Sequence, residues 1–123
     1  MVANSLKGDS IMKDKNGINN LSVDLQKKLN IFDHASKNSK ISSFLTWSEF
    51  SMIFVNTTLI FPLAYGTTNF ELMNCGDKSI LTIDYKDADN DLIFNYNSAQ
   101  DLLDKALIDN KPLKDLWNDV LIS

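Results

Sequence analysis

Two alternating stretches decide the fold, Ser79-Ile-Leu-Thr-Ile-Asp-Tyr85 and Leu92-Ile-Phe-Asn-Tyr-Asn97. In each stretch, every second residue is a large apolar or aromatic one, which is the period of a strand with one face in the core. The residues between them are mostly short and polar and favour a turn, so the pair predicts an antiparallel hairpin. A third strand is expected over Phe70 to Asn74, and Cys75 to Lys78 would then form the turn into the next strand.

Helical patterns follow these strands. Ser98 is suited to cap a helix, and Asp101 places a carboxylate near its N-terminus. The stripe at helical spacing consists of Ala99, Leu102, Leu103 and Ala106. Pro112 can begin a second helix, because its missing N–H costs nothing in the first turn. That helix is predicted from apolar residues at i, i+3, i+4, i+7 and i+8: Leu113, Leu116, Trp117, Val120 and Leu121.

Two helices are also expected before the strands. Ser22 can cap one that runs to about Lys37, and Thr46-Trp-Ser-Glu49 is a capping box that opens a second, from Trp47 to about Thr58. The β-branched residues from Val55 onward leave the boundary between helix and strand open. The sequence therefore predicts an α+β fold, an antiparallel meander of at least three strands with helices packed on one face.

Composition fits one small domain. The chain has 123 residues, 44% of them hydrophobic, and a single cysteine, so it has no intramolecular disulfide. Residues 1–20 are polar and aperiodic and are expected to form a leader, with a single α+β domain over 21–123. The start of the chain lacks the apolar segment of a signal peptide, and the apolar run from Phe50 to Tyr65 is too short to span a bilayer. We therefore expect a cytoplasmic protein without membrane contact.

Charge is divided unevenly along the chain. Residues 1–45 contain seven Lys and four Asp, a balance of +3, whereas residues 46–123 contain five Lys and twelve Asp or Glu, a balance of −7, which together give the net −4. All the basic residues are lysine. The chain therefore lacks arginine, the side chain that most often makes bidentate hydrogen bonds to phosphate and guanine. This pattern argues against direct nucleic-acid binding and favours a basic protein partner.

The sequence contains no complete catalytic or metal-binding motif. Asp87, Asp89 and Asp91 match the first ligands of a calcium loop, but Leu92 stands where glycine is required and Ser98 where glutamate is required. A solvated hairpin tip explains these carboxylates better. The only histidine and the only cysteine, His34 and Cys75, have no sequence context that pairs them as base and nucleophile. The sequence therefore predicts no enzyme, cofactor or metal.

The C-terminal residues carry a family resemblance. Asp91-Leu-Ile-Phe-Asn-Tyr-Asn97, the helix after it, and Asp109-Asn-Lys-Pro-Leu-Lys-Asp-Leu-Trp-Asn-Asp-Val120 resemble the tail of small bacterial immunity proteins that accompany polymorphic or contact-dependent growth-inhibition toxins. Asn110 stands where that pattern has glycine and Pro112 where it has serine. The resemblance covers about thirty residues. It implies an inhibitor that binds one cognate toxin domain, often a basic nuclease, and blocks its active site or substrate cleft.

Partner-binding residues are expected in the densest acidic segment and at the ends of the predicted hairpin. Fast association with a basic toxin requires complementary charge, and slow release requires a desolvated anchor. Two other interpretations stay open, a structural or adaptor domain that dimerises through a sheet edge and a small enzyme with an unrecognised site. The predicted contact residues are Asp84, Asp87, Asp89, Asp91, Asp101, Asp104, Tyr85 and Tyr96.

Overall fold

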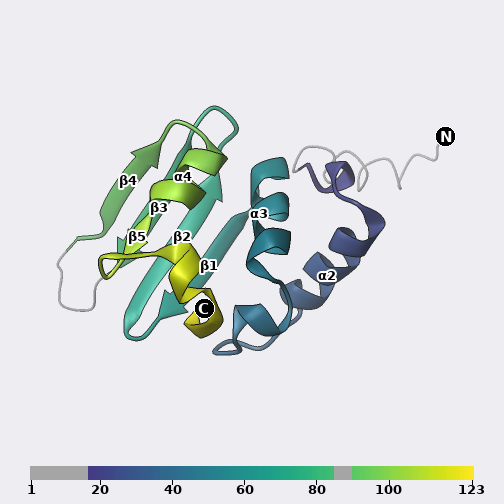
Figure 1. Ribbon diagram of the computed structural model, residues 1–123, viewed down its shortest axis with the longest axis horizontal. Coiled ribbons are helices and arrows are strands. Elements are labelled where there is room, and N and C mark those ends of the chain that lie inside the picture. The colour runs from purple at the N-terminus through teal and green to yellow at the C-terminus, as the bar shows by residue number, and fades with distance from the viewer. Residues whose placement is uncertain (1–16, 85–89) are drawn as a thin grey trace.

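The computed structural model describes residues 17–84 and 90–123, which form an α+β fold (Figure 1). The predicted fold class is confirmed, because the described strands make an antiparallel sheet with helices over one face. The elements, in chain order, are η1 (Ile18–Asn20), α2 (Val23–Asp33), η2 (Ile41–Ser43), α3 (Trp47–Asn56), β1 (Ile60–Tyr65), β2 (Thr68–Asn74), β3 (Ser79–Asp84), β4 (Leu92–Tyr96), α4 (Ala99–Lys105), β5 (Leu107–Ile108), β6 (Lys111–Pro112), α5 (Leu113–Leu116), η3 (Trp117–Asp119) and β7 (Leu121–Ile122).

The main sheet has the strand order β4-β3-β2-β1-β7. Strands β2, β3 and β4 are the predicted meander, and each pairs antiparallel with its neighbour in the chain. Strand β1 was not predicted from the sequence. It pairs with β2 from Ile60 opposite Met73 to Tyr65 opposite Thr68, so the apolar run after α3 is core strand and not a longer helix. The predicted helix ends are also too late, since α2 stops at Asp33 and α3 at Asn56.

Register gives the sheet one covered and one open face. The covered face carries the row Phe61–Leu72–Leu81–Phe94, and the open face carries the row Pro62–Glu71–Thr82–Ile93. Figure 1 shows α4 over the covered face, α3 beside β1, and α2 on the far side of α3. Except for the partly buried Tyr65, the side chains of β1, β2 and β3 on the covered face are buried, whereas those on the open face are mostly exposed. The open face therefore has no layer of described residues above it.

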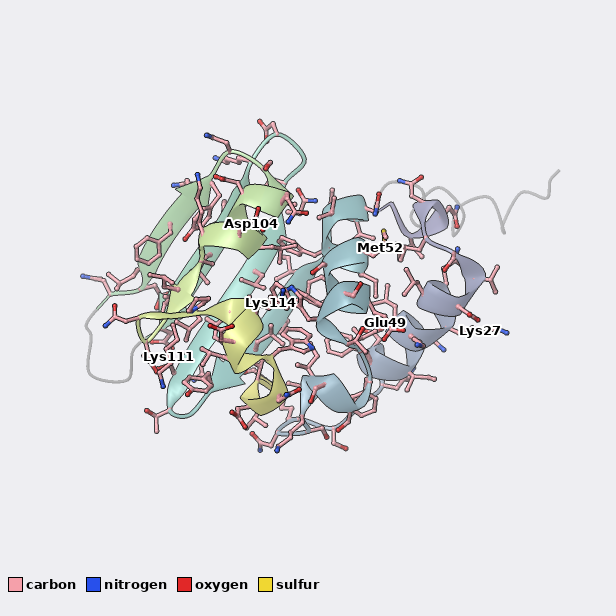
Figure 2. The ribbon with its side chains drawn as sticks, viewed as in Figure 1. Lys27, Glu49, Met52, Asp104, Lys111 and Lys114 are labelled. Carbon is pink, nitrogen blue, oxygen red and sulfur yellow. The ribbon has the colours of Figure 1, made fainter. Side chains whose placement is uncertain are left out.

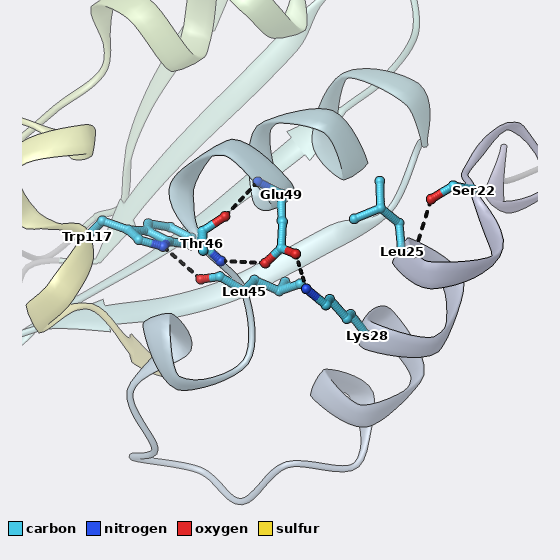
Figure 3. Close-up of polar contacts among 7 residues, drawn as sticks. All are labelled: Ser22, Leu25, Lys28, Leu45, Thr46, Glu49 and Trp117. Carbon is cyan, nitrogen blue, oxygen red and sulfur yellow. Dashed lines mark hydrogen bonds and ion pairs between the residues drawn. The ribbon is translucent and has the colours of Figure 1, made fainter.

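An aromatic cluster joins α3, β1 and the C-terminal segment. The Phe50 ring centroid lies 5.9 Å from that of Phe54, 5.0 Å from Phe61 and 4.7 Å from Trp117. Trp117 also donates its indole N–H to the Leu45 carbonyl at 3.0 Å (Figure 3). Trp47 joins this cluster, because its ring packs edge-on against Trp117.

The C-terminal segment differs from its prediction. Instead of one helix over residues 113–121, α5 and η3 form a short turn and β7 is extended. The Ile122 N–H donates to the Ser39 carbonyl at 2.8 Å and β7 pairs with β1, and a helix would lose these bonds. Before α5, the strands β5 and β6 form a small hairpin whose turn has two residues. Asp109 and Asn110 both have positive φ there, 52° and 66°, as a type I′ turn requires.

The capping box at the start of α3 is confirmed (Figure 3). Thr46 Oγ1 accepts from the Glu49 N–H at 3.1 Å, and a Glu49 carboxylate oxygen accepts from the Thr46 N–H at 2.9 Å. Replacing Thr46 with alanine is expected to lower the free energy of unfolding by about 1 kcal/mol, because a helix N–H loses its acceptor. Urea unfolding checks this, with Ser48→Ala, exposed in the same turn, as a control of little effect. Equal losses from both would contradict the capping role.

Glu49 also pairs with Lys28 of α2 (Figure 3). The Lys28 ammonium, and then the Thr46 N–H, lower the pKa of Glu49 below 4.5. A lowered folded pKa gives stability that is present above the unfolded value and lost as pH falls through the folded one. Glu49→Gln keeps a capping acceptor, so it should cost about 0.5–1 kcal/mol at neutral pH for a pair that is partly exposed. Urea unfolding should show that difference shrinking below pH 4.5, and a constant difference would contradict it.

A buried asparagine ties β2 to the C-terminus of α3. The Asn74 side-chain amide donates to the carbonyls of Phe54 at 3.0 Å and Thr57 at 2.9 Å. Its oxygen accepts from the Gly76 N–H at 2.9 Å. Helix ends leave carbonyls without intrahelical partners, and Asn74 satisfies them from a neighbouring strand. This contact fixes α3 against the sheet.

Helices built by the described residues are all too short or too polar to cross a bilayer.

Candidate protein-binding surface

Strand β4 forms one edge of the sheet and carries exposed apolar residues on both faces. Leu92, Ile93 and Phe94 are 45%, 63% and 42% exposed. Leu92 and Phe94 point to the covered face, opposite Ile83 and Leu81, and Ile93 points to the open face, opposite Thr82. Three consecutive exposed apolar residues on an edge strand are unusual, because native sheets normally protect such an edge with charges, proline or a bulge.

The opposite edge of the sheet is covered. Strand β7 lies between β1 and residues 38–41, where the Asn38 N–H donates to the Ile122 carbonyl at 2.7 Å and Lys40 bridges to Leu121. Across residues 17–84 and 90–123, no strand pairs with the outer side of β4. The two edges therefore differ, and β4 is the one that leaves backbone hydrogen-bonding groups for a partner.

Carboxylates border β4 on the open face. Asp84 ends β3, Asp91 precedes β4, and both line a hollow of about 230 Å³ together with Glu71 of β2. None of β1, β2, β3 and β4 contains a lysine, so no cation from these strands neutralises the group. The open face near β4 therefore joins exposed apolar area to negative charge.

The remaining described residues of the predicted site lie at the other end of β4 and over the covered face. Tyr96 is partly buried, and this burial, then the nearby Asp101 charge, raises the pKa of its phenol. Asp101 pairs with Lys105 at 2.8 Å, which lowers the pKa of the Asp101 carboxyl and raises that of Lys105. Asp104 is exposed on α4 (Figure 2) and accepts from the Gln100 amide at 3.0 Å.

A second hollow, of about 260 Å³, opens beside β4 on the covered face. Its wall is formed by the side chains of Phe94 and Tyr96, by Lys105 at the end of α4, and by Leu107 of β5. Leu107 is 49% exposed, so this hollow has an apolar rim. It exists because α4 has only seven residues and ends before it covers the whole length of β4.

The structure thus divides the predicted contact residues. It brings Asp84 and Asp91 together on the open face, and Tyr96 and Asp101 together at the start of α4. Asp101 and Asp104 are on a helix that packs over the other face of the sheet, so these two pairs do not form one patch. Tyr85, Asp87 and Asp89 lie outside the described residues. We call the residues that border the exposed edge the β4 surface: Asp84, Asp91, Leu92, Ile93, Phe94 and Tyr96.

Sequence reasoning missed the apolar part of this surface. The alternation of residues predicts a half-buried strand for Leu92, Ile93 and Phe94. The feature that sets this strand apart is its three consecutive apolar residues without any charged residue. Whether such a strand is central or at an edge depends on which other strands pair with it.

The other candidate residues have ordinary surroundings. His34 ends α2, and its Nδ1 lies 2.8 Å from the Asn30 carbonyl. Cys75 is an exposed free thiol in the turn between β2 and β3. Within the part of the chain that the structure describes, no three His, Cys, Asp or Glu side chains are grouped as metal ligands. The β4 surface remains the feature with the clearest capacity for binding.

Comparison of the chain with protein-family models, with curated proteins and with solved structures found no match.

Proposed function

We propose that this chain is an immunity protein that binds a cognate bacterial toxin domain and neutralises it by blocking its active site or substrate cleft. The observation that carries the proposal is the β4 surface, where exposed Leu92, Ile93 and Phe94 adjoin the carboxylates of Asp84 and Asp91. The resemblance of residues 91–120 to immunity proteins supports it. The proposed partner is a basic nuclease domain, and the proposed compartment is the cytoplasm.

Both parts of the surface have a role in this function. Carboxylates beside strands that contain no lysine steer a basic protein toward the surface and make association fast and sensitive to salt. Apolar side chains that lose water on binding slow the release of the partner. An inhibitor needs no reacting group of its own, and its effect comes from occupying the cleft of the toxin.

The same edge supports a second candidate function, a dimeric adaptor. Antiparallel self-pairing centred on Phe94 would place Leu92 opposite Tyr96 and Ile93 opposite Asn95 of the second copy, with no like charges opposed. It would also leave the carboxylates of Asp84 and Asp91 without cationic partners, since β4 contains no lysine. For that reason the basic toxin is the better fit.

The test is affinity capture from the native strain, with the wild-type chain and the Ile93→Lys variant as parallel baits. We expect wild type to retain one basic protein with an affinity in the nanomolar range that weakens with added salt, and the variant to bind the same protein at least about tenfold more weakly. Identification of that protein as a toxin domain would support the proposal. Capture of no partner, with the wild-type chain eluting as a dimer, would overturn it in favour of the adaptor.

A further inference from the structure

We propose that β4 is a docking edge, on which an extended segment of the partner pairs as an additional strand with basic side chains on the open face and apolar side chains on the covered face. The identity of the partner rests on the proposed function. The mode of binding follows from the backbone of β4 and from the surfaces on its two faces.

The outer edge of β4 is available to pair with an added strand. Its five residues are paired with β3 on one side, and the other side has no strand partner among the described residues. The strand contains no charged residue and no proline, so nothing in its sequence obstructs the approach of another strand. An added strand would satisfy the free N–H and C=O groups and would give the partner a fixed register.

The covered face specifies apolar side chains in the partner segment. Alternate residues of an added strand point to this side, next to Leu92, Phe94 and Tyr96. They would enter the hollow of about 260 Å³ whose rim includes the exposed Leu107. Filling it would also bury Phe94, which is 42% exposed in the free chain.

The open face specifies basic side chains. The other alternate residues of the added strand would lie beside Ile93 and toward Asp84, Asp91 and Glu71, which line the other hollow. Lysine or arginine can cover Ile93 with its aliphatic stem and place its charge among the carboxylates. A second copy of this chain would offer only Ile93 and Asn95 on that face, so charge complementarity selects a basic partner.

The experiment uses a blocked peptide, Val-Lys-Val-Lys-Val-Lys, as a probe for the ¹⁵N-labelled full chain. A second peptide with the same side chains has its central amides N-methylated, so it keeps the charge and cannot pair as a strand. We expect saturable amide shifts at β4 with the first peptide and slower hydrogen exchange there by about tenfold or more. The N-methylated peptide is expected to bind at least about tenfold more weakly.

Two variants test the position. Ile93→Lys puts a cation where basic side chains of the probe would lie, and we expect it to weaken peptide binding by about tenfold or more. Ile60→Lys introduces the same charge on the same face, with a native side chain that is also exposed, but on β1. At strand spacing, β1 lies about 14 Å from β4, so this control should change binding less than about twofold. Unchanged dispersion of the β3 and core amides would show that both variants are folded.

Several results would overturn the docking edge. Equal binding of both peptides would mean that charge alone attracts the probe, and shifts on another element would place binding elsewhere. Protection of β4 amides in the free chain, with self-association, would assign the edge to a second copy. If a toxin is captured but the β4 amides exchange as fast in the complex as in the free chain, the docking-edge proposal is contradicted and the proposed immunity function stands. If the peptide pairs with β4 but no toxin partner is found, the proposed immunity function is contradicted and the docking-edge proposal stands.

Discussion

Replacing Phe50 with alanine is expected to lower the free energy of unfolding by about 3–5 kcal/mol. Phe50 is fully buried, and its ring lies against Phe54, Phe61 and Trp117 at centroid distances of 4.7 to 5.9 Å. These rings come from α3, β1 and η3, so the cavity would open where the helices meet the sheet. Small domains have only about 5–15 kcal/mol in total, so this loss is a large fraction of the stability and should lower the urea midpoint of the variant well below that of wild type.

Urea unfolding followed by far-UV circular dichroism measures this effect without relying on the tryptophans next to Phe50. Phe94→Ala is the matched control. The Phe94 ring is 42% exposed, and its removal is expected to cost less than half as much. Phe50→Leu keeps most of the buried volume and should give a measurable intermediate loss if the alanine variant does not fold. Equal losses at positions 50 and 94 would contradict the assignment of Phe50 to the centre of the core.

Replacing Asn74 with aspartate is the second large effect, a loss of about 3 kcal/mol or more at neutral pH. The substitution changes almost no volume. It removes the amide that donates to the Phe54 and Thr57 carbonyls, and it places a charged oxygen against them. Asn74 is only 6% exposed, so water cannot replace the lost partners.

The pH dependence separates this mechanism from a simple packing defect. Burial beside carbonyl oxygens should raise the folded pKa of the introduced carboxyl above its unfolded value of about 3.9. A raised folded pKa means that stability is lost as pH rises, so the deficit relative to wild type should grow between about pH 4 and 7. Urea unfolding at several pH values tests it, with the exposed Asn95→Asp as control. A deficit that is independent of pH would contradict the proposed role of the amide.

Local sequence signals predicted the parts of the fold that depend on neighbours in the chain. Thr46 and Ser98 cap their helices as expected, because a cap is made within three residues. Strands β2, β3 and β4 follow from period-two alternation. These elements need no information about distant residues.

The rest of the fold depends on long-range pairing. Residues 113–121 satisfy a helical pattern because Leu113, Leu116, Trp117 and Val120 are all buried, but hydrogen bonds to β1 and to Ser39 make the last part extended. Strand β1 could not be predicted from the sequence for a related reason. The residues on both sides of the polar Asn56-Thr57-Thr58 are mostly apolar, and apolar runs do not distinguish helix from buried strand.

The candidate site was predictable only in part. Charge patterning pointed to Asp84 and Asp91, which do lie together. The exposure of Ile93 follows from the open face to which it points and from the position of β4 at the end of the strand order, and both are properties of the whole fold. The separation of Asp101 and Asp104 from the open face likewise depends on the side of the sheet on which α4 packs.

The most direct test of the proposed function is a titration of the captured partner's own activity with this chain. With the partner held at a concentration below its Kd, we expect wild-type chain and Ile60→Lys to suppress the activity to background over the same concentration range, and half-inhibition by Ile93→Lys to require at least about tenfold more. A partner that stays fully active in the presence of excess bound wild-type chain would contradict the account, because a protein that binds without inhibiting its partner confers no immunity.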